Sequence, residues 1–236
     1  MARRTGFTLI ELAVVLAVVG LVLASALQAT RVMGEAQRVR DTRAQLAEIR
    51  EALLGFAVAN GHLPCPAAPA ATGAAIGVED RANAGGCNRE QGLLPWATLG
   101  LGQTDAFGRP FSYRVSGYFA DTDPATVGGC SGAPPPAGVS FALCSSGNLT
   151  VRPAAGAIET LALNAVAVVI SHGSHGPGPL QPGGAGDEAA NADDDTAFVS
   201  HDRTEAAAGV AAYDDLSDWL PPATLLSRML VAGRLP

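Results

Sequence analysis

Residues 6–12 of this chain read Gly6-Phe7-Thr8-Leu9-Ile10-Glu11-Leu12. They open an apolar run that continues to residue 27 and carries one carboxylate, that of Glu11. A charged side chain at the centre of a bilayer costs roughly 2.5–3.5 kcal/mol on insertion scales, so a carboxylate kept inside such a run indicates a function.

The apolar run of residues 7–27 is long enough to form one membrane-spanning helix. At about 1.5 Å per residue it reaches about 31 Å, which matches the hydrocarbon core of a bilayer. Arg3 and Arg4 lie just before the run, and the positive-inside tendency keeps that end in the cytoplasm. We therefore predict a single-pass inner-membrane protein with residues 28–236 on the periplasmic side.

The basic leader, the Gly6-Phe7 junction and the position of Glu11 closely resemble the type IV prepilin signal. Pilins and the pseudopilins of type II secretion share this signal. The resemblance implies that residues 1–6 are a leader peptide, that a prepilin peptidase cuts between Gly6 and Phe7, and that the new amine of Phe7 is methylated. It also implies assembly through residues 7–27 into a filament, with other subunits and an inner-membrane assembly platform as partners.

Glu11 lies one helical turn beyond the new amino terminus. There its carboxylate can pair with the amine of a neighbouring subunit, which replaces an isolated charge in lipid by a satisfied one and fixes the axial register. Our hypothesis is that Glu11 drives assembly.

Two other interpretations of the same segment stay open. Ala24-Ser25-Ala26 offers an A-x-A-like cleavage site, as in the secretory signal peptide of a periplasmic binding protein or hydrolase. A plain membrane anchor is the second. The length of the run and Glu11 disfavour the first, and a plain anchor requires no particular order of residues 6–12.

Beyond the membrane, residues 28–60 are predicted to continue the same helix. The segment up to Ala59 holds no proline, and apolar residues recur at gaps of three, four and seven, typical of one helical stripe. Asn60-Gly61, followed by Pro64, predicts the end of the helix. The members of the stripe are Val32, Ala36, Val39, Leu46, Ile49, Leu53 and Phe56. A helix with one half in the membrane and one half packed on a head is the shared backbone of the pilin fold.

Residues 61–236 are predicted to form a globular α+β head with an antiparallel sheet and long loops. Alternating segments predict strands at Phe111–Val115 and Val139–Leu143. The second half of the apolar segment Leu161–Ile170 is predicted to be a buried central strand. Residues rich in glycine and proline predict loops between these segments, above all at residues 63–91.

Near the end of the chain, Leu216–Leu230 has helical spacing in its last part and is broken by Pro221-Pro222. We predict a short helix there, with Asp215 or Ser217 as its cap. Trp219 is predicted to be buried.

Four cysteines follow the predicted membrane span, at Cys65, Cys87, Cys130 and Cys144. An even number in an exported domain predicts two disulfides, for which three connectivities are possible. We favour Cys65–Cys87 with Cys130–Cys144, because each pair would close a loop rich in glycine and proline.

The chain is acidic, with a formal net charge of −7. Removal of the leader with its two arginines makes it −9. Nucleic-acid binding needs basic stripes that replace counterions, so we expect no nucleic-acid partner.

Two segments of the head are similar to elements of the major type II pseudopilin. Residues 104–113 are similar to its Asp-Pro-Trp-Gly…Tyr turn and strand, and residues 170–176 to its Ser-x-Gly-x-Asp-Gly turn. In those relatives, oxygens of the loop after this turn bind calcium. This chain departs from that pattern, because His175 stands where the aspartate would be.

An acidic cluster nonetheless follows that turn, and its alternating side-chain oxygens are of the kind that calcium prefers. It predicts a structural Ca²⁺ site as the one candidate cofactor, although a solvated acidic loop is an alternative. The candidate ligands are Asp187, Glu188, Asn191, Asp193 and Asp195.

No group of residues predicts catalysis. His172 and His175 form an H-x-x-H pair, but glycines lie around them and no H-E-x-x-H helix is present. We predict a non-enzymatic filament subunit, either a minor pseudopilin or a minor pilin. The head is larger than expected for a major pseudopilin, which favours a minor subunit.

Overall fold

The computed structural model describes residues 9–122, 135–175, 178–181, 186–209 and 211–236, without the side chains of residues 23–32. It divides into two compact units, Met1–Arg40 and Asp41–Pro236. One helix, α1 (Leu9–Asn60), runs through the boundary between them.

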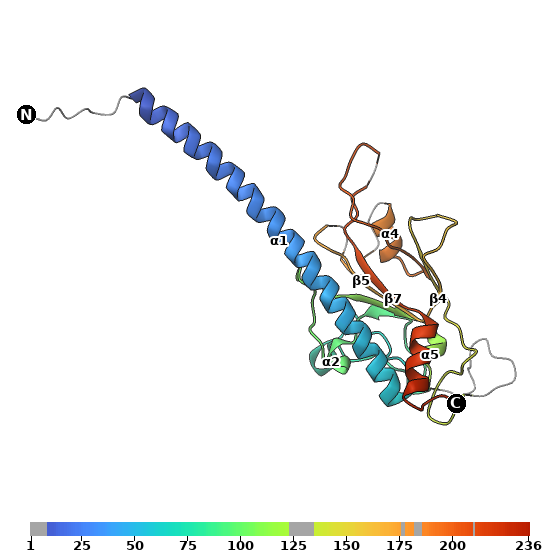
Figure 1. Cartoon of the computed structure of the whole chain (residues 1–236). Helices are drawn as coiled ribbons and strands as arrows, with labels where there is room; N and C mark the ends of the chain where they lie inside the picture. Colours follow the sequence, from blue (N-terminus) through green and yellow to red (C-terminus); the bar gives the residue numbers. More distant parts are fainter. Residues whose placement is uncertain (1–8, 123–134, 176–177, 182–185, 210) are drawn as a thin grey trace, which may run out of the picture. The chain divides into compact units, whose positions relative to one another are not determined.

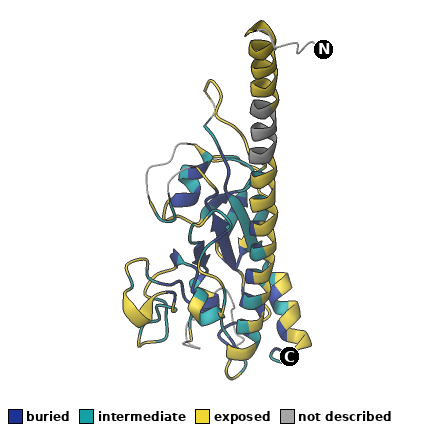
Figure 2. Cartoon of the chain, turned by 90° about the vertical axis from the view of Figure 1, so that its left-hand side faces the viewer, coloured by how far each residue is buried: buried dark blue, intermediate teal, exposed yellow. Residues whose placement is uncertain are grey.

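The first unit consists of the first part of α1, drawn in dark blue in Figure 1. Its large apolar side chains are exposed from Leu9 to Val22, as Figure 2 shows by colour. Within the described residues, no helix meets the combined length and apolarity that a membrane crossing requires.

In the second unit, α1 turns one apolar stripe into the core of the head. Leu46, Ile49 and Leu53 of the predicted stripe are buried there, and Phe56 is half-buried. The helix ends at Asn60, and Gly61 follows with φ of +81°. A Cβ at Gly61 would lie 1.8 Å from the carbonyl oxygen of Gly138, so glycine is required both by the backbone and by the close approach. The predicted end of the helix is confirmed.

The main sheet of the head is antiparallel and has four strands in the order β1-β2-β5-β7. The strands are β1 (Gln91–Leu93), β2 (Ser112–Val115), β5 (Ala167–Ser171) and β7 (Leu216–Leu220). The predicted strand at Phe111–Val115 is β2, and β5 is the predicted central strand.

A second sheet has the order β4-β3-β6 and contains one parallel pair, β3 with β6, beside the antiparallel pair of β3 with β4. The head is therefore not antiparallel throughout. The strands of this sheet are β3 (Leu149–Arg152), β4 (Ala162–Ala165) and β6 (Ala197–Val199).

β5 is buried on both faces and joins two apolar clusters. Ala167 and Val169 lie in the cluster that also contains the stripe of α1, whereas Val168 and Ile170 lie in the cluster of β3 and β6. Successive side chains of a strand point to opposite faces. A strand covered on both faces therefore needs a continuous apolar run, which this segment supplies.

Short helices complete the head. Of these, α5 contacts α1 through an ion pair of 2.7 Å between Arg228 and Glu51. Arg50 of α1 forms a bidentate ion pair with Asp218 of β7, in which two guanidinium nitrogens donate to the two carboxylate oxygens. The helices are α2 (Trp96–Leu99), α3 (Gly117–Ala120), α4 (Asp187–Ala192), α5 (Pro222–Val231) and the 3₁₀ helix Gly73–Ala75.

The predicted strand Val139–Leu143 is wrong. Its backbone instead forms local turns. The N–H groups of Val139 and Ser145 donate to the carbonyl oxygens of Pro136 and Ala142, each three residues earlier. The N–H of Ala142 donates to the Ser145 hydroxyl. The alternation reflected burial, since Val139 and Phe141 enter the main core from an irregular segment.

Two predictions near the end of the chain are also wrong. Pro221, and neither Asp215 nor Ser217, is the N-cap residue of α5, because residues 216–220 pair with β5 as strand β7. Trp219 is half-buried.

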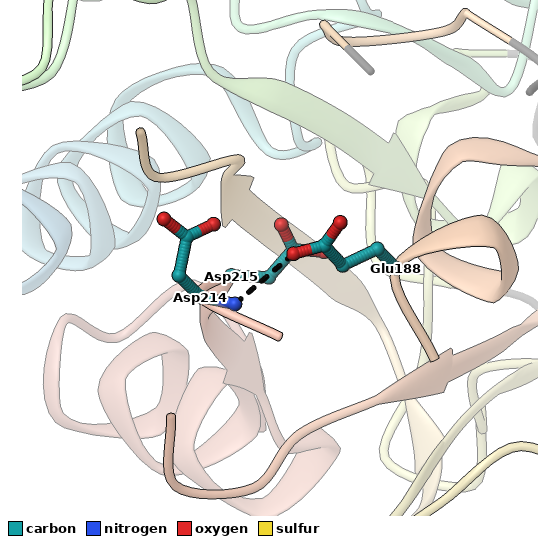
Figure 3. A group of neighbouring side chains, drawn as sticks. All are labelled: Glu188, Asp214 and Asp215. Atoms are coloured by element: carbon teal, nitrogen blue, oxygen red, sulfur yellow. Dashed lines mark hydrogen bonds between the residues drawn. The ribbon is translucent and has the colours of Figure 1, made fainter. Parts of the chain in front are cut away.

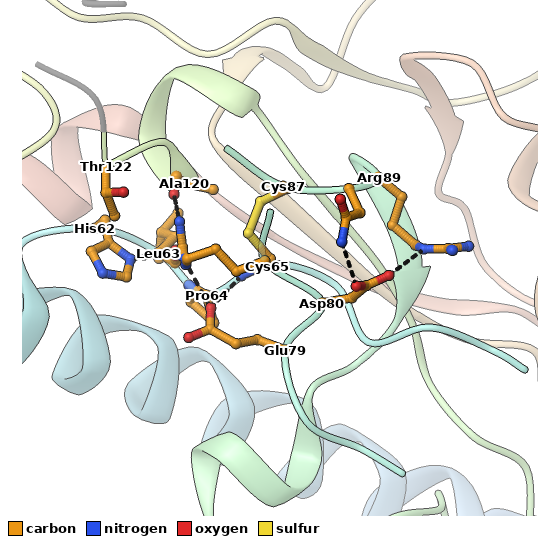
Figure 4. Close-up of a disulfide and its surroundings, with 12 residues drawn as sticks. His62, Leu63, Pro64, Cys65, Glu79, Asp80, Cys87, Arg89, Ala120 and Thr122 are labelled. Carbon is orange, nitrogen blue, oxygen red and sulfur yellow. Dashed lines mark hydrogen bonds and ion pairs between the residues drawn. A yellow bond between two sulfur atoms is a disulfide. The ribbon is translucent and has the colours of Figure 1, made fainter. Parts of the chain in front are cut away.

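A disulfide joins Cys65 to Cys87, which is the pairing favoured by the sequence, and ties down the loop after α1 (Figure 4). Beside it, Glu79 accepts a hydrogen bond from the Cys65 N–H at 3.1 Å, and Arg81 donates to the carbonyl of Ala120 at 2.6 Å. Cys144 is also disulfide-bonded, and Cys130 lies outside the described residues.

Candidate functional site

The predicted processing site, Gly6 and Phe7, lies outside the described residues. Glu11 lies in the first turn of α1 and is exposed. Around it, ten large apolar side chains are exposed to between 46% and 88%. These are Leu9, Ile10, Leu12, Val14, Val15, Leu16, Val18, Val19, Leu21 and Val22.

Such a surface is unusual for a soluble monomer, in which contiguous exposed apolar patches rarely exceed a few hundred Å². A helix that is apolar on all sides has to be covered by lipid or by other protein. The first part of α1 is therefore a surface for association, and Glu11 is the acidic group in its first turn.

The five residues predicted to hold calcium do not converge on one point. Asp187 accepts one hydrogen bond from the N–H of Ala155 and lies 3.1 Å from His201 Nε2. Asp193 accepts a hydrogen bond from the N–H of Asp195 at 3.3 Å, and Asp195 accepts one from the N–H of Ala197, the first residue of β6, at 2.7 Å. These side chains have separate hydrogen-bond partners, since Asp187 begins α4 (Asp187–Ala192) and Asp193 and Asp195 follow it. Calcium binding by this set stays a prediction.

Asn191 has a structural role instead. Its side chain is buried, accepts a hydrogen bond from the N–H of Val199 at 2.8 Å and donates to its carbonyl at 3.1 Å. It also donates to the Asp215 carboxylate at 2.8 Å. This amide fixes α4 against β6, and its oxygen already accepts the N–H of Val199.

Glu188 takes part in a different cluster, with Asp214 and Asp215 from the segment before β7 (Figure 3). All three are buried, with exposed fractions of 6%, 7% and 3%. One carboxylate oxygen from each lies within 4.8 Å of the others. The Glu188 side chain also accepts a hydrogen bond from the Asp214 N–H at 3.2 Å. We call these three residues the acidic triad.

Two members of the acidic triad have pKa values shifted in opposite directions. Burial raises the pKa of Glu188, and the neighbouring charge of Asp215 raises it further. Burial also opposes the ionisation of Asp214, but hydrogen bonds from His175 and Ser174 outweigh it and hold that pKa below its usual value. Buried carboxylates that repel one another favour uptake of a proton or a cation.

The two histidines of the H-x-x-H pair contact different partners. His175 Nδ1 lies 2.9 Å from the Asp214 carboxylate and is largely exposed. His172 is buried, with Nε2 at 2.6 Å from the Ser112 hydroxyl and Nδ1 at 3.6 Å from the Asp215 carboxylate. The pair therefore does not converge on one metal ion.

Ser112, His172 and Asp215 follow the order of partners found in serine hydrolases. All three are almost fully buried, however, so a substrate has no access to the Ser112 hydroxyl. We interpret them as a structural network that links β2, the end of β5 and the start of β7.

The predicted turn and strand at residues 104–113 contact the turn at residues 170–175. Asp105 accepts hydrogen bonds from the N–H groups of Phe107 and Arg109 and from the Ser171 hydroxyl, the last at 2.6 Å. The Arg109 guanidinium donates to the carbonyl oxygens of His172 and His175. The turn after β5 is thus held by polar contacts within the head.

Comparison with known proteins finds a match at the amino terminus of the chain. Residues 1–27 match the model of the prokaryotic N-terminal methylation motif. No curated protein and no solved structure matches the chain. The chain carries the signature of type IV pilins and pseudopilins, which indicates a structural subunit that is membrane-anchored or pilus-associated, processed by a prepilin peptidase and assembled with other pilin subunits.

Proposed function

We propose that this protein is a non-enzymatic subunit of a type IV pilus or of a type II secretion pseudopilus. The methylation motif at residues 1–27 carries the proposal. The exposed apolar surface of residues 9–22 supports it, because a filament core would cover that surface.

The proposed processing leaves a charge close to Glu11. Cleavage between Gly6 and Phe7 removes the leader and creates an amine at Phe7, which is then methylated and keeps its charge. Glu11 lies one helical turn further on, where its carboxylate pairs with the amine of a neighbouring subunit in an apolar core. A charge pair is far less costly in such a medium than either charge alone, so the pair favours one axial register.

We propose that residues 7–27 cross the inner membrane before assembly, with the head in the periplasm. The cysteines support an exported head, because disulfides form in oxidising compartments. The size of the head, residues 61–236, favours a minor subunit over a major one.

Replacement of Glu11 tests the assembly role. We expect Glu11→Gln to be cleaved normally but to enter filaments at least about tenfold less than the wild type, because the amide cannot neutralise an amine. The measurement is the amount of this subunit in sheared filament fractions from the native host. Glu48→Gln is the matched control, since Glu48 is an exposed carboxylate of the same helix outside the apolar run. Normal incorporation of Glu11→Gln would contradict the role of Glu11.

The mature amino terminus tests the processing. Mass spectrometry of the purified mature chain should find an N-methylated Phe7 as its first residue. A chain that begins at Leu27 would instead support a periplasmic binding protein or hydrolase with a signal peptide. An uncleaved chain would support a plain anchor.

A further inference from the structure

Strand β7 lies at one end of the main sheet, whose order is β1-β2-β5-β7. It pairs with β5 along one edge, and its other edge pairs with no strand among the described residues. The main-chain N–H and C=O groups of such an edge are a template for another extended chain.

A cavity of about 460 Å³ lies at the start of this strand, where Ser217 lines it. It is also lined by Arg43 and Leu46 of α1, the helix that packs on one face of the main sheet. Pro153, which follows β3, and Leu161, which precedes β4, line it from the second sheet, which packs on the opposite face. Because coverings of both faces meet at this cavity, it lies along the outer edge of β7.

Two exposed side chains that line the cavity carry opposite charges, those of Arg43 in α1 and Asp202 after β6. Neither has an ion-pair or side-chain hydrogen-bond partner among the described residues. The carboxylate of Asp215, a third lining residue, is 1% exposed and faces Asn191 and His172 instead. The two exposed charges are therefore available to a bound molecule.

Two other lining residues lack contacts that a bound peptide would supply. The hydroxyl oxygen of Ser217 is buried without a hydrogen-bond partner among the described residues, which costs free energy. Leu161 is 50% exposed. A peptide offers both main-chain hydrogen-bonding groups and apolar side chains that cover a leucine.

We propose that this cavity binds an extended segment of a different protein, which adds to β7 as a further strand and carries an acidic residue next to a basic one. Successive side chains of a strand point to opposite faces of the sheet. The acidic side chain therefore reaches Arg43 on the side of α1, and the basic one reaches Asp202 on the side of the second sheet. Main-chain hydrogen bonds supply the affinity, and the two charges supply the specificity.

The bound segment is assigned to a different protein, because the adjacent opposite charges of this chain are all engaged elsewhere. They lie in α1, in ion pairs of the head or at the cavity itself. These pairs are Arg40-Asp41, Arg50-Glu51, Asp80-Arg81, Arg89-Glu90 and Asp202-Arg203. The proposal concerns the head alone and does not depend on the filament role.

Titration with model peptides tests the proposal, because recognition rests on main-chain groups and on two charges. The probe is the peptide acetyl-Thr-Val-Glu-Arg-Val-Thr-amide, added to the isotope-labelled full chain in detergent and followed by NMR. We expect shifts of the amide signals of residues 215–217, with a Kd on the order of 1 mM, because the contact is small and the peptide loses conformational freedom.

Two changes of the peptide separate its contacts. Replacement of its glutamate by glutamine should weaken binding about two- to fivefold, the range expected for an exposed ion pair. Methylation of all its main-chain nitrogens should abolish binding, because it removes the N–H groups that pair with the edge of β7.

A variant of the chain identifies the partner of the glutamate. Arg43→Gln should bind the two peptides, with glutamate or with glutamine, equally well. Arg38→Gln is the matched control and should keep the difference, because Arg38 is another exposed arginine of α1 and does not line the cavity.

Absence of shifts at residues 215–217 at about 10 mM peptide would overturn the proposal, as would equal binding of the methylated peptide. Equal affinity of the wild type for the glutamate and glutamine peptides would overturn the pairing with Arg43. Shifts of the same signals on dilution without peptide would show that a second copy fills the cavity, and would overturn the assignment to a different protein. None of these outcomes bears on Glu11, so the filament role and the peptide site can fail separately.

Discussion

The two parts of α1 belong to one continuous helix but have opposite surfaces. From Leu9 to Val22 the large apolar side chains are exposed. From Asp41 to Asn60, charged side chains lie outside, and one apolar stripe, with Leu46, Ile49 and Leu53, enters the core of the head. The same helical backbone therefore serves association in its first part and folding of the head in its second part. The distribution of apolar and charged side chains around the helix determines which.

Truncation of one leucine in each part should separate these uses most clearly. Leu53 is 2% exposed and Leu16 is 63% exposed. We expect Leu53→Ala to lower the free energy of unfolding of the head by about 2–5 kcal/mol, because it leaves a cavity. Leu16→Ala should leave the unfolding of the head unchanged and reduce entry into filaments. Urea denaturation followed by tryptophan fluorescence measures the unfolding of both variants. The amount of Leu16→Ala in sheared filament fractions measures its entry into filaments. A similar destabilisation by both variants would refute the division of α1 into two uses.

Removal of the Cys65–Cys87 disulfide should have the next largest effect, again on the head alone. The bond closes a loop with a sequence separation of 22 residues, for which the chain-entropy model gives about 3 kcal/mol. We expect the double variant Cys65→Ala/Cys87→Ala to be less stable by about that amount in oxidising buffer, measured by denaturation.

Reductant provides the control for the disulfide. Reductant also opens the disulfide of Cys144, so the wild type and the double variant are compared with both proteins in reductant, where their stabilities should be equal. A gap that persists between the two reduced proteins would show that the substitutions act through packing.

The smallest expected effect is a change of stability with pH, caused by His62, which lies two residues after the end of α1. Burial lowers the pKa of His62 below 6.5, and its Nδ1 lies 3.0 Å from the Arg81 guanidinium. The unfolded chain then binds the proton more readily, so this contribution to stability is complete above pH 6.5 and is lost as the pH falls towards the lower folded pKa. We expect the wild type to lose more stability than His62→Gln between pH 7.5 and pH 5.5, as measured by thermal melts. Parallel losses would show that His62 does not titrate in this way.

Much of the fold could be predicted from the sequence, where local pattern and burial agree. The later part of the α1 stripe, from Leu46 to Phe56, the end of the helix at Asn60-Gly61, strand β2 and the central strand β5 are confirmed. Helical spacing, turn residues and a continuous apolar run each have few structural solutions. Ala36, an earlier member of the predicted stripe, is exposed. Val139–Leu143 misled the prediction, because its alternating side chains are buried by an irregular segment. Strand β7 was missed, because it depends on pairing with β5.

The amino-terminal signal needs no tertiary contact, since its chemistry lies in consecutive residues, and the sequence alone identified it. That recognition was confirmed by the match of residues 1–27 to the methylation motif. The processing at Gly6 and Phe7 and the role of Glu11 stay predictions.

The acidic triad could not be predicted in the same way. Asp214 and Asp215 lie far along the chain from Glu188, and only the packing of α4 beside the start of β7 brings their carboxylates within 4.8 Å of one another. Sequence spacing reports neighbours on one element, whereas a site assembled from several elements depends on long-range packing.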